Sequence, residues 1–365
     1  MTRLFRRDKK FFGTIAGLAP ENNLKFNIYF LNKTFYILQK NNLYKKMKIL
    51  ANDGLSKSGV EALEHAGFEV IMTKVAQEQV ATYINENNIA VLLVRSATKA
   101  KQDLIDACPN LKIIGRGGVG MDNIDVEYAR QKGIHVINTP ASSSESVAEL
   151  VFAHLFSGVR FLHDANRSMP LEGDLNFDGL KKAYANGIEL RGKTIGIIGF
   201  GRIGQAVAKM ALGLGMKVIA SDKFVGKADV KVDFYNGQFI NVEIETEPMD
   251  DLLQHADFIT LHVPAQKGYV IGANEIKLMK QDVGIVNCAR GGIIDEVALL
   301  DGLDQGKILF AGLDVFENEP TPEIKILMHS KISLTPHIGA ATLEAQDRIG
   351  TELAAQIVSL LKTEK

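Results

Sequence analysis

The sequence predicts an α/β protein made of two doubly wound parallel-sheet domains with a cleft between them. From Met47 onwards, short runs of Val, Ile and Leu alternate with helical patterns, which is typical of parallel sheets covered by helices. The chain has 365 residues, of which 46% are hydrophobic, and this is enough for two compact domains that each bury a core. The apolar runs fall into two series, which indicates two sheets.

Residues 1–46 differ in charge from the rest of the chain. They hold ten Lys or Arg and two acids, which leaves 32 basic and 41 acidic residues in the remainder. A basic leader could be an organelle transit peptide, but this one is rich in Asn and Lys, poor in Ser and without the apolar core of a secretory signal. We expect a disordered or normally untranslated extension before a folded protein that begins at Met47, and no nucleic-acid partner.

Residues 47–140 are expected to form the first part of a flavodoxin-like domain. Its strands are expected in the apolar runs 48–52, 68–72, 90–94, 112–115 and 135–139. Two segments between them, 56–67 and 77–87, have apolar residues at helical spacing.

Residues 141–335 are expected to form a Rossmann domain with a dimerisation arm. Its strands are expected at 194–199, 217–221, 258–263, 283–289, 308–316 and 331–337. Between the two series, residues 142–169 predict one long helix, whose Ser-rich start would cap its free N–H groups. The polar stretch 226–248 is expected to form strands and loops.

The last segment, 336–365, contains a helical pattern that has no place in a completed second sheet. We therefore expect it to return to the first domain. The hinges would then lie at 138–140 and 335–337, and two crossings between domains make a cleft, where open α/β sheets usually bind a ligand.

Two glycine-rich loops fit the pattern G-x-G-x-x-G, and the residues that follow them separate a cofactor site from a look-alike. The loops run from Gly115 to Gly120 and from Gly199 to Gly204. A dinucleotide site also needs a helix that starts in the loop, so that its N–H groups and dipole meet the pyrophosphate. It needs an acid at the end of the next strand for the ribose hydroxyls as well.

Only the second loop is followed by both features. A helical pattern follows Gly204 directly, and the next strand ends on Asp222, eighteen residues later. After Gly120 comes the turn-like stretch MDNID, and the next strand ends on the uncharged Asn138 at the same spacing. The carboxylate of Asp222 would repel a 2′-phosphate, so we expect NAD rather than NADP, although Lys223 beside it weakens that preference.

Three residues at the ends of late apolar strands are the catalytic candidates: Arg290, Glu319 and His337. Hydride transfer at a carbon that bears oxygen needs a proton acceptor, a group that orients it and a cation for the carboxylate or carbonyl. His, Glu and Arg supply these three functions. Each also has an ordinary alternative: a hinge or core histidine, a solvated loop acid and an arginine in a surface turn.

Four motifs together resemble the D-isomer-specific 2-hydroxyacid dehydrogenase family: GFGRIG with Asp222, NCARGGIIDE, AGLDVFENEP and TPHIGAAT. The resemblance covers nearly everything from Met47 onwards. It implies that His337 is the general acid/base, that Glu319 hydrogen-bonds it and that Arg290 binds the substrate carboxylate. The implied NAD site comprises Gly199, Gly201, Arg202, Ile203, Gly204, Asp222, Val263, Cys288, Ala289, Asp314, Gly339 and Ala340.

Within the family, VRSATKA, GRGGVGMDNID and VINTPASSSESVAEL resemble members that oxidise D-3-phosphoglycerate to 3-phosphohydroxypyruvate, the entry step of L-serine synthesis. A phosphate needs cations beyond Arg290, and Arg95 and Arg116 occupy loops that should face the cleft. Ser96 and the N–H groups of Gly118, Val119 and Gly120 would complete an anion cradle. Alternatively, Arg116 forms a salt bridge within its domain.

Other functions stay open. The main alternative is a reductase of glyoxylate, hydroxypyruvate or another 2-hydroxyacid, which would not need the extra arginines. A remote one is an NAD-sensing corepressor-like protein, because the fold also serves as a corepressor scaffold.

Two departures from the family concern its partners. Residues 173–192 lack the tryptophan that members often carry in the arm of a homodimer, which leaves Lys181 or Lys182 as weak candidates for contacts to the partner's site. The sequence also stops at Lys365, so we expect a short form without an appended regulatory domain and without serine inhibition through one.

Cysteines and apolar runs restrict the class of protein further. Cys108 and Cys288 are the two cysteines, far apart and without a Cys/His cluster, so neither a disulfide framework nor a metal site is expected. That pattern fits a reducing, cytoplasmic compartment. No window approaches the roughly 20 apolar residues of a membrane span, and we expect no membrane partner.

Overall fold

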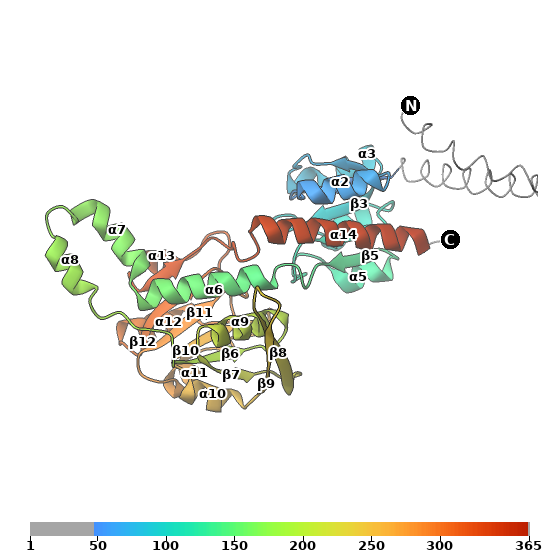
Figure 1. Ribbon diagram of the computed structural model, residues 1–365. Coiled ribbons are helices and arrows are strands. Elements are labelled where there is room, and N and C mark those ends of the chain that lie inside the picture. Colours follow the sequence, from blue (N-terminus) through green and yellow to red (C-terminus); the bar gives the residue numbers. More distant parts are fainter. Residues whose placement is uncertain (1–46, 364–365) are drawn as a thin grey trace, which may run out of the picture.

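The computed structural model describes residues 47–363 and confirms an α/β fold with two separate parallel sheets (Figure 1). The first sheet has five strands in the order β2-β1-β3-β4-β5. The expectations for residues 1–46 concern a segment outside the described range. The strands are β1 (Lys48–Ala51), β2 (Glu69–Ile71), β3 (Ile89–Val94), β4 (Ile113–Arg116) and β5 (His135–Asn138).

Helices cover both faces of the first sheet because its strands are apolar on both sides. Leu92 and Val94 of β3 pack with the helices of one face, whereas Val91 and Leu93 pack with those of the other. The helices are α2 (Lys57–His65), η3 (Gln77–Gln79), α3 (Val80–Glu86), α4 (Gln102–Ala107) and α5 (Val126–Gln131).

The second sheet has six parallel strands in the order β13-β12-β11-β10-β6-β7. A separate antiparallel hairpin packs on α9 and occupies the polar stretch that was expected to hold strands and loops. The strands of the sheet are β6 (Thr194–Ile198), β7 (Lys217–Ser221), β10 (Phe258–Leu261), β11 (Val283–Asn287), β12 (Ile308–Leu313) and β13 (Ile332–Leu334), and the hairpin is β8 (Lys227–Asp233) and β9 (Phe239–Glu245).

Helices also cover both faces of this sheet. One face packs against α6 and α9, and the opposite face against α10, α11 and α12. These helices are α6 (Ser144–Val159), α9 (Arg202–Gly213), α10 (Met249–His255), α11 (Ala273–Leu278), α12 (Glu296–Asp304) and α13 (Ile324–Met328).

The C-terminal helix, α14 (Leu343–Thr363), lies on the first sheet beside α2 (Figure 1). Its residues Ile349, Leu353 and Ile357 are buried in the same cluster as the strands of that sheet. A Cβ on Gly59 of α2 would lie 2.7 Å from the Cα of Gly350, so two glycines let these helices approach closely. The chain therefore crosses between the two sheets twice, after β5 and after β13.

The prediction of one long helix over residues 142–169 is wrong. The helix is divided into α6 and α7 (Leu162–Glu172) because Phe161 adopts a left-handed conformation, with φ of 56°. The Ser-rich start does not cap α6, since Ser143 at the N-cap accepts no hydrogen bond with its side chain. Instead Ser142 donates to Glu352, and Ser146 bonds Thr342 at 2.7 Å, so these serines join the two crossing segments.

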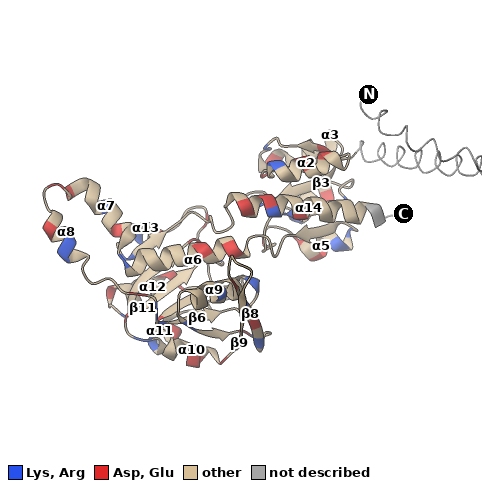
Figure 2. Cartoon of the chain, viewed as in Figure 1, with Lys and Arg blue, Asp and Glu red and all other residues tan. Residues whose placement is uncertain are grey.

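Helices α7 and α8 (Phe177–Ala183) form an arm that extends beyond the second sheet (Figure 1). The arm exposes Leu162, Met169, Leu171, Leu175 and Phe177. Basic and acidic residues are mixed along α5, α8 and α14 (Figure 2). Within residues 47–363, no helix is long and apolar enough to cross a membrane.

Candidate active site

The Gly199 loop joins β6 to α9, as a dinucleotide site requires. Gly201 is the N-cap of α9, so the free N–H groups of the helix start inside the loop. Asp222 follows β7 and accepts hydrogen bonds from the main-chain N–H groups of Phe200 (2.6 Å), Phe224 (2.7 Å) and Val225 (2.9 Å). Burial alone would raise the pKa of Asp222, but these donors outweigh it and hold the pKa below its usual value.

The geometry of the loop fits a bound dinucleotide. A Cβ on Gly199, whose φ is +95°, would lie 2.6 Å from the main-chain oxygen of His262, so the loop needs glycine there. A Cβ on Gly201 would meet no protein atom within 4 Å, which leaves space for phosphate oxygens beside the helix start. His262 also lines the cavity, and its buried Nδ1 has no hydrogen-bond partner among residues 47–363. The open position at Gly201 is the feature that leaves space for the cofactor.

The Gly115 loop has a different structure after a similar strand. It follows β4, but no helix starts within it, and α5 begins only at Val126. Asn138, at the position equivalent to Asp222, donates its side-chain amide to the main-chain oxygen of Val119 at 2.7 Å. A Cβ on Gly120 would lie 1.5 Å from a guanidinium nitrogen of Arg290. This loop therefore makes room for an arginine of the other domain.

The anion cradle expected at this loop is smaller than the sequence suggested. The N–H group of Gly118 donates to the main-chain oxygen of Arg116 at 3.0 Å, so it is used within the loop. Gly118, Val119 and Gly120 all line the cavity with Arg95, Ser96 and Arg116, although the N–H of Gly118 is used within the loop.

His337 and Glu319 form a hydrogen-bonded pair at the edge of the cavity. His337 Nδ1 lies 2.9 Å from Glu319 Oε2, and Glu319 Oε1 accepts from the N–H of Phe316 at 3.1 Å. Burial would raise the pKa of Glu319, but His337, the N–H of Phe316 and the charge of Arg290 together outweigh this effect, and the pKa is lowered. Since Nδ1 is engaged, His337 can exchange a proton with a ligand through Nε2.

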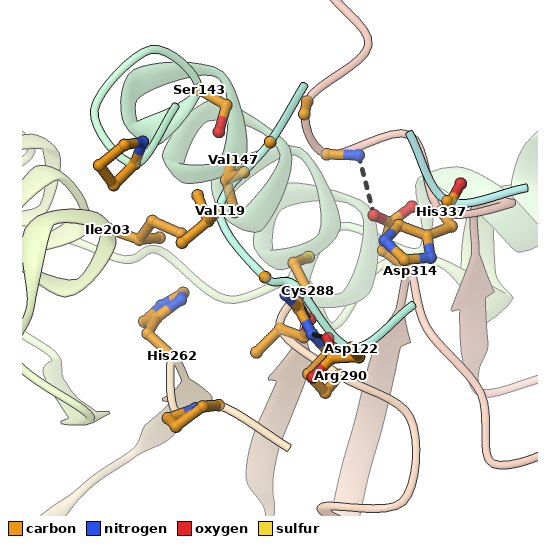
Figure 3. A pocket seen from close by; sticks show the side chains of 18 of the residues that line it. Val119, Asp122, Ser143, Val147, Ile203, His262, Cys288, Arg290, Asp314 and His337 are labelled. Atoms are coloured by element: carbon orange, nitrogen blue, oxygen red, sulfur yellow. Dashed lines mark hydrogen bonds and ion pairs between the residues drawn. The ribbon is translucent and has the colours of Figure 1, made fainter. Parts of the chain in front are cut away.

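Arg290 follows β11 and reaches across the cleft. Its Nε donates to Asp122 Oδ2 at 2.8 Å, and a second nitrogen donates to the main-chain oxygen of Ala289 at 2.6 Å. Figure 3 shows Arg290 and Asp122 side by side in the cavity wall. Because Asp122 lies in the loop after β4, this ion pair connects the two domains. The sequence analysis did not select Asp122, although it lies within the MDNID stretch.

One cavity of about 500 Å³ collects residues of both domains (Figure 3). Arg290 and His337 line it, whereas Glu319 supports His337 from behind and is not part of the lining. Asp222, Gly199 and Gly204 lie in the adjoining loop region and do not line it. The expected cofactor residues in the lining are Gly201, Arg202, Ile203, Val263, Cys288, Ala289, Asp314, Gly339 and Ala340.

Positive charge is concentrated around this cavity. Burial lowers the pKa of Arg116 to about 10, and the neighbouring charge of Arg290 contributes to the decrease. Arg116 Nε donates to Asn123 Oδ1 at 3.2 Å. Arg95 also lines a second hollow of about 470 Å³, which contains Lys74, a residue that the sequence analysis did not select. Lys74 lines only this second hollow, whereas Arg95, Arg116 and Arg290 all line the main cavity. These three arginines suit an anion with more than one charge.

Cys288 and Cys108 are both free thiols and both buried. Burial raises the pKa of Cys288 well above its usual range, and Asp314 adds to the shift. Cys288 is therefore a neutral neighbour of the cavity rather than a nucleophile.

Known proteins resemble this chain over most of its length. Residues 152–339 match the D-isomer specific 2-hydroxyacid dehydrogenase NAD binding domain. The D-3-phosphoglycerate dehydrogenase of Methanocaldococcus jannaschii is 42% identical over 87% of this chain, which spans only 58% of that relative. The hydroxypyruvate reductase of Thermotoga maritima is 43% identical over 86% of this chain and 97% of its own length.

Solved structures show the same fold. The TT0316 protein from Thermus thermophilus has a TM-score of 0.74 at 27% identity and covers 87% of this chain and 97% of its own. The acyclic imino acid reductase Bsp5, in complex with NADPH and D-Arg, has a TM-score of 0.73 at 28% identity, covering 87% of this chain and 98% of its own. The chain therefore belongs to the D-isomer-specific 2-hydroxyacid dehydrogenase family and carries its NAD-binding domain.

Proposed function

We propose that the protein oxidises D-3-phosphoglycerate to 3-phosphohydroxypyruvate with NAD, as the entry step of serine synthesis. The observation that carries this proposal is the convergence of Arg95, Arg116 and Arg290 on the cavity that His337 lines. Relatives named D-3-phosphoglycerate dehydrogenase, such as the one from Methanocaldococcus jannaschii at 42% identity, support the substrate.

The residues of the chain divide the reaction between them. The Gly199 loop and Asp222 would hold NAD, which would supply the acceptor for the hydride that leaves C2 of the substrate. His337 Nε2 takes the proton of the C2 hydroxyl, while Glu319 holds the ring through Nδ1 at 2.9 Å. Arg290 binds the substrate carboxylate and polarises the C2 oxygen as it becomes a carbonyl.

Arg290 is already engaged before substrate binds. Its Nε contacts Asp122 at 2.8 Å, and the side chain of Asp122 is 55% exposed, so this carboxylate can move aside into solvent. A substrate carboxylate would replace Asp122 as the partner of Arg290. Asp122 thus keeps the arginine oriented across the cleft until the substrate arrives.

The phosphate is the feature that separates this substrate from smaller hydroxy acids. We assign it to Arg95 and Arg116 in the first domain, with Lys74 at the far side of Arg95. Burial disfavours the charged form of Arg116, which a dianionic ligand would compensate. Glyoxylate, which has a single negative charge, offers no such compensation.

The deciding experiment measures NADH formation at alkaline pH with D-3-phosphoglycerate, with D-glycerate and with NADP in place of NAD. Preference for the phosphorylated acid with NAD is expected. Arg95→Ala and Arg116→Ala should each lower kcat/KM for D-3-phosphoglycerate by about tenfold or more and change that for D-glycerate little. Activity confined to unphosphorylated acids would refute the substrate.

The second candidate function is reduction of hydroxypyruvate or glyoxylate. It is favoured by the Thermotoga maritima hydroxypyruvate reductase, which this chain matches over 97% of its length. His337, Glu319 and Arg290 would have the same roles in the reverse direction. Under this alternative the Arg95 and Arg116 variants would affect phosphorylated and unphosphorylated substrates equally.

We further propose that two copies associate through the arm. Leu171 and Leu175 have exposed fractions of 83% and 89%, and Phe177 is exposed at 58%, so a second copy would cover a large apolar area. Light scattering should report a dimer, and Leu171→Glu with Leu175→Glu should give monomers. A wild-type monomer at micromolar concentration would contradict this assembly.

Free thiols at Cys108 and Cys288 support a reducing, cytoplasmic location.

A further inference from the structure

A histidine that the mechanism does not use lies in the core beneath the catalytic loop. His154 of α6 is only 2% exposed, and both of its ring nitrogens have partners. Nδ1 lies 2.9 Å from Ser333 Oγ, and Nε2 lies 3.0 Å from Thr335 Oγ1. Both partners belong to the segment that ends at His337.

The contacts of Thr335 determine which nitrogen of His154 carries the proton. Thr335 Oγ1 donates its single hydrogen to Asp314 Oδ1 at 2.6 Å. Its oxygen can therefore only accept from His154, so Nε2 must be the protonated nitrogen. Burial lowers the pKa of His154 to about 4, with a smaller contribution from His163, so the ring is neutral and Nδ1 is an acceptor.

The hydrogen of Ser333 completes the chain, because Nδ1 of His154 is left without a proton. Ser333 Oγ could donate its single hydrogen to Ser157 Oγ at 3.3 Å or to Nδ1 of His154 at 2.9 Å. We place the hydrogen on the shorter contact, because Nδ1 is an acceptor without a proton. The hydrogen bonds then run in one direction from Ser333 through His154 and Thr335 to the carboxylate of Asp314. Each donor in such a chain strengthens the next.

Asp314 connects this chain to the catalytic loop. Its carboxylate is fully buried, and it accepts from the N–H groups of Ile338 at 2.8 Å and Gly339 at 2.9 Å. Its main-chain oxygen accepts from the N–H of His337 at 2.9 Å. These bonds hold His337 in a left-handed conformation, with φ of 54°, which is uncommon for residues other than glycine.

The backbone near His154 is shaped for this contact. A Cβ on Gly312 would lie 2.6 Å from the Cβ of His154, so the glycine in β12 allows α6 to approach the sheet. Gly312 is two residues before Asp314, which places the imidazole beside the end of the strand that carries the carboxylate.

We propose that His154 is a positioning residue for the catalytic histidine. As a donor to Thr335, it keeps the Asp314 carboxylate bound to the amides of Ile338 and Gly339 and thereby fixes the orientation of His337. The inference rests on the proposed role of His337 as acid/base. It adds a residue on α6, 183 positions before His337 in the chain, to the groups on which the reaction depends.

The test compares two variants of similar side-chain size. His154→Gln keeps an N–H donor near the position of Nε2, whereas His154→Met has none. In His154→Met we expect the amides of Ile338 and Gly339 to exchange hydrogen about tenfold faster and kcat to fall about tenfold, with KM for the hydroxy acid changed less than threefold. His154→Gln should stay within threefold of wild type in all three measurements.

A double-mutant cycle shows whether His154 acts through Thr335. Thr335→Val removes the hydroxyl and should reproduce the effects of His154→Met, and the double variant should be no worse than Thr335→Val alone. Additive losses, or equal behaviour of the Gln and Met variants, would overturn the inference. So would a His154→Met protein with a lower melting temperature but normal kcat and normal amide exchange.

Kinetics and hydrogen exchange also test the proposed reaction and this inference separately. An inactive wild-type protein would count against the proposed reaction, and hydrogen exchange at Ile338 and Gly339 would still decide whether His154 fixes the loop.

Discussion

The two glycine-rich loops have the same spacing of glycines, yet the structure uses them for opposite purposes. In the Gly199 loop, the absent side chain at Gly201 leaves open space beside the start of a long helix. In the other loop, the absent side chain at Gly120 is replaced by the guanidinium group of Arg290. A glycine pattern therefore identifies a backbone that another group approaches closely. The surrounding residues determine whether that group is a ligand or a side chain of the protein.

The largest effect is expected at His337, which lines the same cavity as residues of both loops. His337→Ala removes the proton acceptor and should lower kcat by roughly 10²–10⁴-fold. The affinity for NADH, measured by fluorescence, should stay within threefold of wild type, because the cofactor loop is unchanged. Full activity of the variant would remove His337 from the mechanism.

A matched pair of substitutions tests the comparison directly. Gly201→Ala places a methyl group in the space assigned to the cofactor and should weaken NADH binding by about tenfold. Gly120→Ala displaces Arg290 and should leave NADH binding unchanged while raising KM for the hydroxy acid by about tenfold.

Titration of each variant with NADH, followed by steady-state kinetics, measures both effects. The comparison between the loops fails if Gly120→Ala weakens NADH binding as much as Gly201→Ala does.

The residues that end the strands after the two loops form a second matched pair. Asp222→Asn removes the charge that we assign to the ribose and should raise the KM for NAD several-fold while improving the use of NADP. Asn138→Asp introduces the charge at the other loop, where it should leave the preference between NAD and NADP unchanged. Ratios of kcat/KM for the two cofactors measure the difference, and an altered ratio in the Asn138 variant would contradict the assignment.

The smallest effect is expected from the pH dependence of stability. The pKa of Glu319 is lowered in the folded state. Burial, the largest single effect, would raise it, but His337, the N–H of Phe316 and the charge of Arg290 together outweigh burial. Its ionised form therefore stabilises the fold above the unfolded pKa, and this contribution is lost as the pH falls through the lowered value.

Urea unfolding of wild type and Glu319→Gln at pH 7 and pH 3 tests this expectation. The wild type should be the more stable at pH 7, and the difference should shrink at pH 3. A difference that is constant with pH would mean that the ionised carboxylate is not the stabilising form.

The sequence predicted the parts of the molecule that depend on local periodicity. The buried strands and the helix of the Gly199 loop follow from apolar spacing, and Asp222 follows from its distance to Gly204. The break of the helix after α6 was missed because it depends on the left-handed conformation of Phe161. A glycine at this position would have indicated such a conformation, but a phenylalanine does not. Sequence periodicity contains no signal for such a conformation.

Contacts between distant segments were also missed. Asp122 and Arg290 are 168 residues apart, and His154 and Thr335 are 181 apart, so neither pair could be recognised by spacing. In addition, the serines at the start of α6 were expected to cap it because Ser is a common capping residue. Instead, Ser142 and Ser146 bond Glu352 and Thr342 of the C-terminal segment.

The two crossings between the domains are tied to each other where Ser146 meets Thr342 and Ser142 meets Glu352. A single connecting segment would allow one domain to rotate about several axes. Two adjacent segments joined by hydrogen bonds restrict the rotation to one axis. We therefore expect the two domains to open and close about this axis alone. Each closure would then return Arg290 to the same position beside the Gly115 loop.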